Sequence, residues 1–348
     1  MDIEDIVALS VKHNAGDLHL CSGHSPFWRR SGRLEKITDM PLVNDAQLQE
    51  VVHRWLDAQQ QTQFDRAGHV DFALSLPDGT RLRANFFRQR QGVSLALRVI
   101  GSDCPDLASL RLPAIVSELL RLQDGLVLVT GATGSGKSTT LAALIGAMNQ
   151  QQHRHILTLE DPVEFIHSSQ HSLIQQREVG LHCCSFSAGL RAALREDPDV
   201  ILLGELRDSD TIQQALTAAE TGHLVLATLH TRGAAQVVDR LVDVFPGAEK
   251  NLIRSQLAGS LKAVIAQKLV PDNAQGRIAL YEVLVNTPAV ANLIREGKTH
   301  QLPGVLQTGM QSGMQTFGQS LNERQRAGLL QQSSAPGAFK PAFEDHNG

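Results

Sequence analysis

The chain has few aromatic residues and little excess charge. Aromatic side chains make up 4% of its 348 residues, and the formal net charge is -4 at pH 7. Non-specific binding to nucleic acid or to an acidic membrane needs a cationic surface, and single strands are held on aromatic platforms. These shortages disfavour a nucleic-acid binder, so any basic site has to be local. The 28 glycines favour a ligand-binding surface made of backbone and small residues. Such a surface indicates a phosphate ligand rather than nucleic-acid bases.

Long apolar runs are missing as well. The longest run of consecutive apolar residues covers the 5 residues from Leu141 to Ile145, whereas a membrane-spanning helix needs about 20. The first twenty residues carry several charges, among them Asp2, Glu4 and Asp5, so a signal peptide is not indicated. We therefore expect a protein that is cytoplasmic or peripheral to a membrane.

Paired cysteines and metal-ligand clusters are also lacking. The 4 cysteines include no CxxC pair, and the adjacent Cys183 and Cys184 could bridge each other only with strain. His167 and His171 have helical i, i+4 spacing, but no third ligand accompanies them. Reduced structural thiols are expected, and a zinc site is not.

The length and the hydrophobic content predict two folded domains. With 42% hydrophobic and 20% charged residues, the chain is too apolar for disorder and too long for one ordinary core. The first part predicts a small α+β domain with an antiparallel sheet. Its expected elements are a helix over residues 2–13, one longer helix from Asp45 to Phe64, and strands at His69–Leu76, Arg81–Arg88 and Val93–Ile100.

From about residue 112 the pattern changes to short apolar strands separated by helical stretches. This alternation predicts a mainly parallel sheet with helices on both faces, followed by a helical region after Ala289. The expected strands are Leu126–Thr130, Ile156–Leu159, Val200–Leu203 and Leu224–Leu229. The predicted organisation is therefore a first domain over residues 1–100, a linker over 101–111, a second domain over 112–330 and a mobile tail over 331–348.

A glycine-rich loop stands between the first of these strands and the following helix. Residues 131–139 read GATGSGKST and fit the pattern GxxxxGK[ST] in the strand and helix context that the pattern requires. The glycines let backbone N–H groups point at phosphate, Lys137 reaches the terminal phosphates, and the Ser138 hydroxyl can ligate Mg²⁺. The residues predicted to hold a nucleotide are Gly131, Ala132, Thr133, Gly134, Ser135, Gly136, Lys137, Ser138 and Thr139.

Acidic side chains follow two of the predicted strands. Glu205 comes after the run Val200–Leu203, although Gly204 stands where many such enzymes carry Asp, and Glu160, Asp161 and Glu164 follow Ile156–Leu159. Ligands bind at the carboxyl ends of the strands in open parallel sheets, which is where both groups fall. Either group alone could be solvated loop acids; together with the phosphate loop they favour a catalytic role. His230 ends another strand and could sense a terminal phosphate.

Arginines are concentrated in the first domain. Arg81, Arg83, Arg88, Arg90 and Arg98 fall in a stretch without any Asp or Glu, and strand alternation places Arg81 and Arg83 on one face. Three interpretations remain open: a solvated strand face, a nucleic-acid surface, and arginines delivered to a phosphate in another domain or subunit. Phe86 and Phe87 are too few for a stacking groove, so the nucleic-acid surface ranks last.

The ordered motifs resemble those of the type IV pilus and type II secretion ATPases, and within them the pilus-retraction (PilT-like) branch. The likeness runs from residue 1 to about 330. Besides the phosphate loop, LEDPVEF (Leu159 to Phe165) resembles the family's Asp box, the stretch Leu194 to Asp208 resembles its Walker B segment, and ETGHLVLATLHT (Glu220 to Thr231) resembles its His box.

The resemblance implies a PAS-like first domain, a RecA-like P-loop ATPase domain, and six chains in a ring with ATP and Mg²⁺ between the domains. By position it implies that Lys137 and Ser138 hold phosphate and Mg²⁺, that Glu205 is the Walker B acid near the metal, and that Glu164 activates water. His230 would contact the terminal phosphate. The arginines it implies as phosphate contacts are Arg83 and Arg98 in the first domain and Arg191 and Arg195, which precede the Walker B acid.

Two details bear on the branch. Assembly and secretion ATPases usually carry an extra N-terminal domain, and many carry a four-cysteine insert; neither is expected here. The stretch Ala289 to Lys298 resembles the helix motif of retraction ATPases, usually AIRNLIRE, but Ala291 replaces its Arg. An ordinary helix with Leu293 and Ile294 buried would look the same.

The expected function is a hexameric ATPase on the cytoplasmic face of the inner membrane, docked to a pilus or secretion platform protein, that drives retraction of a pilus-like fibre. A pilus-assembly or type II secretion ATPase is the alternative. A nucleic-acid motor and a nucleotide-binding regulator that does not cycle fit the acids and arginines less well.

Overall fold

The computed structural model describes residues 3–13, 15–30, 33–76, 79–100, 104–273 and 276–330. By their contacts these residues form two compact units. The first contains the described residues up to Cys104 together with Pro162–Ile166, and the second contains the rest. Residues 331–348, predicted as a mobile tail, and 101–103, the start of the predicted linker, lie outside the described residues.

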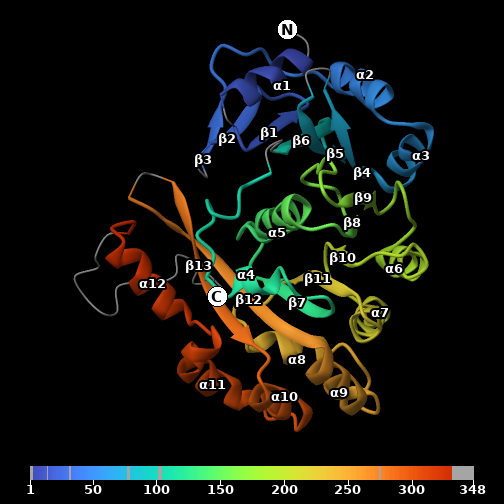
Figure 1. The fold of residues 1–348 in the computed structure, drawn as a ribbon. Helices are drawn as coiled ribbons and strands as arrows, with labels where there is room; N and C mark the ends of the chain where they lie inside the picture. Colours follow the sequence, from blue (N-terminus) through green and yellow to red (C-terminus); the bar gives the residue numbers. More distant parts are fainter. Residues whose placement is uncertain are drawn as a thin grey trace. The chain divides into compact units, whose positions relative to one another are not determined.

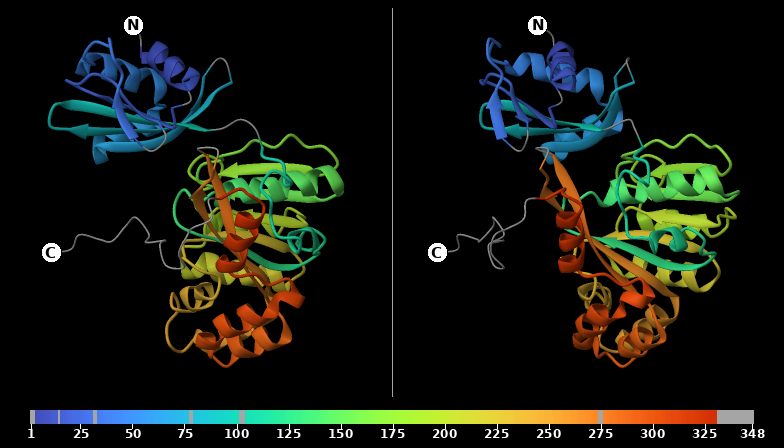
Figure 2. Two further views of the ribbon diagram at one scale, coloured as in Figure 1. Left: turned by 90° about the vertical axis from the view of Figure 1, so that its left-hand side faces the viewer. Right: turned by 60° about the vertical axis from the view of Figure 1, so that its left-hand side comes forward.

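The first unit is an antiparallel sheet with helices on one face. The strand order is β3-β2-β1-β6-β5-β4, and Figure 2 shows the three helices on the same side of this sheet. Leu82, Ala84 and Phe86 alternate with exposed or half-buried neighbours and face the helices. The elements are α1 (Ile3–Lys12), β1 (Asp17–Cys21), β2 (Phe27–Arg30), β3 (Arg33–Lys36), α2 (Asp45–Trp55), α3 (Ala58–Ala67), β4 (His69–Ser75), β5 (Arg81–Gln89) and β6 (Gly92–Ile100).

The prediction of one helix from Asp45 to Phe64 is wrong, because the helix is interrupted and the stretch forms two helices, α2 and α3. Leu56 ends α2 in an extended conformation, with φ -93° and ψ 135°. Asp57 then begins α3 by accepting a hydrogen bond from the Gln60 backbone N–H, while the Gln60 side chain accepts one from the Asp57 backbone. This reciprocal cap satisfies two N–H groups that a continuous helix would have used internally.

The second unit contains a seven-stranded sheet in the order β13-β12-β7-β11-β10-β8-β9. Neighbouring strands are parallel except β12 and β13, which form an antiparallel pair at one edge. The four predicted strands are confirmed, and β9, β12 and β13 are additional. The strands are β7 (Gly125–Thr130), β8 (His155–Glu160), β9 (Leu173–Glu178), β10 (Val200–Leu203), β11 (Leu224–Leu229), β12 (Leu261–Pro271) and β13 (Arg277–Val285).

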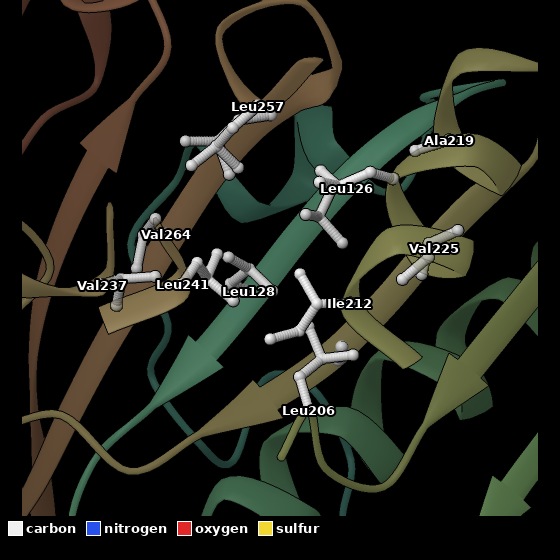
Figure 3. Close-up of a cluster of buried hydrophobic side chains, with 14 of the residues drawn as sticks. Leu126, Leu128, Leu206, Ile212, Ala219, Val225, Val237, Leu241, Leu257 and Val264 are labelled. Atoms are coloured by element: carbon white, nitrogen blue, oxygen red, sulfur yellow. The ribbon is translucent and has the colours of Figure 1, made fainter. Parts of the chain in front are cut away.

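Helices cover both faces of this sheet, as predicted (Figure 1). They are α4 (Val116–Leu119), α5 (Lys137–Gln151), α6 (Phe186–Ala193), α7 (Ser209–Glu220), α8 (Gln236–Val242), α9 (Lys250–Ser260), α10 (Pro288–Arg295), α11 (Leu302–Thr308) and α12 (Phe317–Arg326), with short 3-10 turns η1 (Thr299–Gln301) and η2 (Gly309–Ser312). The larger core lies between the sheet and α7, α8 and α9, where Leu128 of β7, Ile212 of α7 and Leu241 of α8 converge (Figure 3). A second core packs α4 and α5 on the opposite face.

The parallel register brings the loops after four strands to one edge of the sheet. Leu203 of β10 pairs with Leu159 of β8 and Ala227 of β11, and Leu229 of β11 pairs with Thr130 of β7. The residues that follow these strands therefore meet at their carboxyl ends, where ligands bind in open α/β sheets.

Within the residues that the structure describes, no helix combines the length and the apolarity needed to cross a bilayer.

Candidate nucleotide-binding site

The glycine-rich loop connects β7 to α5, as the sequence predicts. Three glycines adopt positive φ, which residues with a side chain rarely do: Gly131 at 150°, Gly134 at 75° and Gly136 at 90°. A Cβ atom on Gly131 would lie 2.4 Å from the Gln267 backbone oxygen and 2.5 Å from the Ser135 hydroxyl. The loop thus leaves no space for a side chain at Gly131, and its backbone lies close to β12.

Lys137, the first residue of α5, is folded into the loop. Its side chain is buried, and its ammonium nitrogen donates to the carbonyl oxygens of Gly131 at 3.0 Å and Ala132 at 3.1 Å. The same nitrogen lies 3.3 Å from Nδ1 of His230. The structure therefore brings together two of the predicted site residues that are far apart in the sequence.

Glu205 is the third member of this group. Its Oε1 lies 3.3 Å from Nε2 of His230, and its Oε2 lies 2.7 Å from a guanidinium nitrogen of Arg207. If His230 is neutral with its proton on Nε2, it accepts from Lys137 and donates to Glu205 at once. Lys137, His230 and Glu205 thus form one continuous chain of polar contacts at the edge of the sheet.

Burial and charge act in opposite directions on Glu205. Burial raises the pKa of its carboxyl, but hydrogen bonds and charge from Arg207 and His230 outweigh it, and the net pKa is lowered. Arg207 responds in the opposite sense, its pKa raised chiefly by its hydrogen bond to Glu205. The carboxylate is therefore held ionised beside the phosphate loop. Sequence reasoning missed Arg207. The usable signal was a basic residue two positions after Glu205 in an extended loop.

Gln267 of β12 is a second residue that sequence reasoning missed. It is 3% exposed, its Nε2 donates to the Ser135 carbonyl at 2.7 Å, and its Oε1 accepts from the Thr140 hydroxyl at 2.8 Å. One buried amide thus ties the glycine-rich loop to the first turns of α5. The only sequence signal was a glutamine directly after the short apolar run Ala263 to Ala266.

Threonine hydroxyls fix the loop that carries His230. Thr231 N donates to the Thr130 hydroxyl at 2.8 Å, and the Thr228 hydroxyl donates to the carbonyl of Gly204. A Cβ on Gly204 would lie 3.3 Å from the Leu159 carbonyl oxygen, which is closer than most Cβ contacts. A side chain at position 204 would therefore need the neighbouring backbone to shift by a few tenths of an ångström, which favours glycine where many such enzymes carry Asp.

The acids after β8 lie in different surroundings. Glu160 Oε1 accepts from the Thr158 hydroxyl at 2.7 Å and from Gln176 Nε2 at 3.2 Å. By its contacts Glu164 belongs to the first unit. Its backbone carbonyl oxygen lies 3.5 Å from a guanidinium nitrogen of Arg81. Glu164 therefore stays a prediction as the residue that activates water.

Arg83 and Arg98 are direct cross-strand neighbours on β5 and β6. Together with Asp17, Arg29 and other residues of the same sheet face they line a groove of about 370 Å³. Arg98 Nε pairs with Asp17 Oδ1 at 2.7 Å. Arg83 is exposed and has no carboxylate partner in the described part of the chain. The groove therefore carries both acidic and basic side chains, and the guanidinium of Arg83 has no carboxylate partner among the described residues.

The other predicted arginines lie at the end of α6. Arg191 and Arg195 are exposed, and a guanidinium nitrogen of Arg195 donates to the Arg191 carbonyl at 3.4 Å. Their role at a phosphate stays a prediction.

Comparison with known proteins agrees with this geometry. Residues 70–331 match the family described as type II/IV secretion system protein. The chain is 62% identical to the uncharacterized protein YggR of Escherichia coli, covering 95% of this chain and 100% of that protein. It is 44% identical to the type IV pilus retraction ATPase PilT of Pseudomonas aeruginosa, covering 96% of this chain and 97% of that protein.

A solved structure supports the same assignment. The crystal structure of the pilus retraction motor PilT with bound ADP matches with a TM-score of 0.87 and 40% identity over 95% of both chains. The fold is that of a two-domain α/β protein of the type II/IV secretion ATPase class, which confirms the predicted fold class. The chain belongs to the type II/IV secretion system protein family.

Proposed function

We propose that this protein is a Mg²⁺-dependent ATPase whose hydrolysis of ATP drives retraction of a type IV pilus-like fibre. The observation that carries the proposal is the convergence of Lys137, His230 and Glu205 on the glycine-rich loop. It occurs in a chain that resembles the P. aeruginosa retraction ATPase over nearly its full length. We further propose that six copies form a ring that acts at the cytoplasmic face of the inner membrane through a platform protein.

The loop fits a nucleotide phosphate. Its glycine backbone leaves the cradle open, and the buried Ser135 hydroxyl has no hydrogen-bond partner among the described residues. Lys137 would hold the phosphates, and Ser138 and Glu205 would hold Mg²⁺, which supplies charge compensation at the transferring phosphoryl group. The donors of Lys137 now serve two neutral carbonyl oxygens, whereas an anionic phosphate accepts more strongly. Lys137 is thus prepared to transfer its hydrogen bonds to nucleotide.

His230 and Glu205 form the hydrolytic side of the site. Glu205 is kept ionised, and His230 can hold its proton on Nε2 between the carboxylate and Lys137. We propose that Glu164 orients the attacking water and that Arg83, Arg98, Arg191 and Arg195 supply positive charge to the phosphates, within one chain or across a subunit boundary. Excluding water and closing these arginines on the phosphates would couple hydrolysis to motion.

Replacing Arg83 with alanine tests the arginine proposal. Arg83→Ala is expected to leave nucleotide affinity nearly unchanged and to slow hydrolysis, because an arginine finger contributes on the order of 10³ to 10⁵ in turnover. Phosphate release and a fluorescent-nucleotide titration measure the two quantities. Arg90→Ala, an exposed arginine of the same stretch, is the matched control. Wild-type turnover in Arg83→Ala would assign this residue to an ordinary solvated sheet face.

Removing Arg207 is expected to shift the pH dependence of turnover. In Arg207→Gln, burial acts on Glu205 with only His230 to oppose it, so the pKa of Glu205 rises. More of the carboxyl is then protonated under mildly acidic conditions, and the acid limb of the kcat/KM profile moves to higher pH. Arg240→Gln, on the exposed side of α8, should keep the wild-type profile. Superimposable profiles for Arg207→Gln and wild type would contradict the role given to Arg207.

Deleting the gene tests the proposed direction of work. Cells that lack the protein are expected to carry excess surface fibres that do not retract, and loss of the fibres would instead support an assembly or secretion ATPase. The helix that resembles the retraction motif, α10, buries Val290 and Ile294 against the larger core, with Ala291 packed beside them. This packing explains the apolar residues of the motif, so the phenotype, not the motif, decides between the two functions.

A further inference from the structure

The loop that carries His230 is held at its far end by a carboxylate from the edge strand β13. Glu282 accepts a hydrogen bond from the backbone N–H of Ala234, with 2.9 Å between the oxygen and the nitrogen. Ala234 is fully buried. A Cβ atom on Gly233 would lie 3.1 Å from the same Glu282 oxygen, so the backbone passes close to the carboxylate. Residues 230–234 are here called the histidine loop.

The strand register explains how an edge strand reaches this loop. Leu229 of β11 is paired with Thr130 of β7. Thr130 is also paired with Ala266 of β12, which in turn is paired with Glu282 of β13. These residues form one row across the sheet, and directly paired residues point to the same face. Leu229 and Ala266 belong to the larger core, so Glu282 projects from the face that α8 covers. The histidine loop leaves this row at Leu229 and is bound to it again at Glu282.

Thr130 anchors the near end of the histidine loop. Its hydroxyl oxygen accepts from the Thr231 backbone N–H at 2.8 Å, and the Thr231 hydroxyl donates to the Gly233 carbonyl at 3.0 Å. Strand β7 ends at Thr130, directly before the glycine-rich loop. The near anchor is thus continuous with the glycine-rich loop, and Glu282 supplies the far anchor from another strand of the same sheet.

The site depends on where the histidine loop places His230. Nδ1 of His230 lies 3.3 Å from the ammonium nitrogen of Lys137, and its Nε2 lies 3.3 Å from Oε1 of Glu205. Both distances are slightly longer than the usual range of about 2.7 to 3.2 Å, so a displacement of the ring away from either group would break the contact. Displacing a reacting group by about 1 Å can lower turnover by about 10²-fold.

A purely structural role for Glu282 would concern α8 instead. The N-cap residue of α8, Ala235, makes no side-chain capping hydrogen bond. Glu282 would then only satisfy the buried N–H of Ala234, which must find a partner in any case. Its loss would loosen the start of α8 and leave His230 in place. The two roles differ in whether turnover depends on Glu282 through His230.

We propose that Glu282 is a positioning residue for His230. Its carboxylate fixes the far end of the histidine loop and thereby keeps the imidazole between Lys137 and Glu205. Two observations carry this inference: the hydrogen bond to the buried Ala234 N–H, and the shared strand row with Thr130, the near anchor. The inference rests on the proposed function, in which His230 acts in ATP hydrolysis.

Two substitutions of Glu282 in the full chain test this role. Methionine is of similar length but supplies no oxygen, so Glu282→Met should lower kcat by about 10- to 100-fold and leave nucleotide affinity within about twofold. Glutamine keeps an oxygen that accepts from Ala234, so Glu282→Gln should stay within about threefold of the wild-type kcat. Phosphate release and a fluorescent-nucleotide titration measure the two quantities. Glu323→Met, which removes an exposed carboxylate that accepts from Gln315, is the matched control.

A double-mutant cycle with His230 separates positioning from general damage. His230→Ala should itself lower turnover. In that background Glu282→Met should add less than about twofold, because a residue that acts through His230 has nothing left to position. If Glu282→Met lowers kcat by the same factor in both backgrounds, Glu282 does not act through His230 and the inference is refuted.

Hydrogen exchange at single amides gives a readout that does not depend on turnover. In Glu282→Met the amide of Ala234 should exchange about two- to tenfold faster, the range that one net hydrogen bond supports. The amide of Thr231, which donates to Thr130 and not to Glu282, should also exchange faster, because the whole loop shifts. Faster exchange at Ala234 alone would limit Glu282 to the start of α8 and refute the inference. Glu282→Gln should keep the wild-type exchange at both amides.

The outcomes distinguish this inference from the proposed function. If His230→Ala hydrolyses ATP at the wild-type rate, the proposed role of His230 fails and the inference fails with it. If His230→Ala is slow but Glu282→Met turns over as the wild type does, Glu282 does not position His230, while the proposed function stands. Loss of turnover in Glu282→Gln with the Ala234 amide still protected would also overturn the inference.

Discussion

Glu205→Gln is expected to lower ATP turnover by about 10³-fold, at the upper end of what one charged or polar group contributes to transition-state stabilisation. The substitution keeps the size of the side chain but removes the charge that faces His230 and Arg207. Lys137 and the glycine backbone remain, so nucleotide affinity should change by only a few fold. Steady-state phosphate release and a fluorescent-nucleotide titration on the same preparation measure both effects.

Glu249→Gln is the matched control for this variant, since Glu249 is exposed and precedes α9 away from the glycine-rich loop. It should hydrolyse ATP at the wild-type rate. Near wild-type hydrolysis by Glu205→Gln would remove Glu205 from the catalytic site and with it the assignment of the Walker B acid.

Lys137→Ala is expected to lose both binding and turnover. The ammonium group is the one cation within the loop itself, held 3.0 Å from the Gly131 carbonyl. Without it the phosphates meet a loop with no compensating charge, so affinity should fall by about tenfold or more and turnover by about 10²- to 10³-fold. Lys262→Ala, which removes a half-exposed lysine that pairs with Asp124, controls for the loss of a lysine in the same unit.

Glu205→Gln and Lys137→Ala are expected to differ in whether nucleotide binding is lost together with hydrolysis, and the assignment of the two residues depends on this difference. Glu205→Gln should separate binding from hydrolysis, and Lys137→Ala should not. If Lys137→Ala bound nucleotide as tightly as the wild type, the glycine-rich loop would not be the phosphate site.

Sequence patterns predicted the parts of the site that depend on local geometry. The glycines of the loop, Lys137 at the start of α5 and Glu205 after β10 follow from short-range spacing, because positive φ and strand ends leave local signatures. The meeting of Lys137 with His230 followed from the rule that parallel strands share one carboxyl edge. Their direct contact could not be predicted, since it depends on side-chain conformations in a packed site.

Gln267, one of the two residues that sequence reasoning missed, acts through long-range contacts. Gln267 reaches Ser135 across 132 positions, and it does so only because β12 adds to the sheet beside β7. The polar residues Lys262, Gln267 and Lys268 interrupt the apolar run, so it does not show strand periodicity clearly. Register and strand order are set by the whole fold, and a single sequence does not show them.

The break between α2 and α3 has a different cause. Asp57 and Gln60 form a reciprocal cap, which the sequence shows as an acid followed three residues later by Gln. The apolar periodicity of Leu48, Val52 and Leu56 hid this signal, because all three are buried on the same side of the unit. The cap at Asp57 therefore starts a second helix where the apolar pattern predicts a continuous one.

The central claim is that hydrolysis at this site drives fibre retraction. The most direct measurement follows labelled surface fibres in living cells from which the gene has been deleted, complemented with either the wild type or Glu205→Gln. We expect retraction with the wild type, and fibres that extend but do not retract with Glu205→Gln at equal protein level. Retraction at the wild-type rate by cells that carry only Glu205→Gln would contradict it.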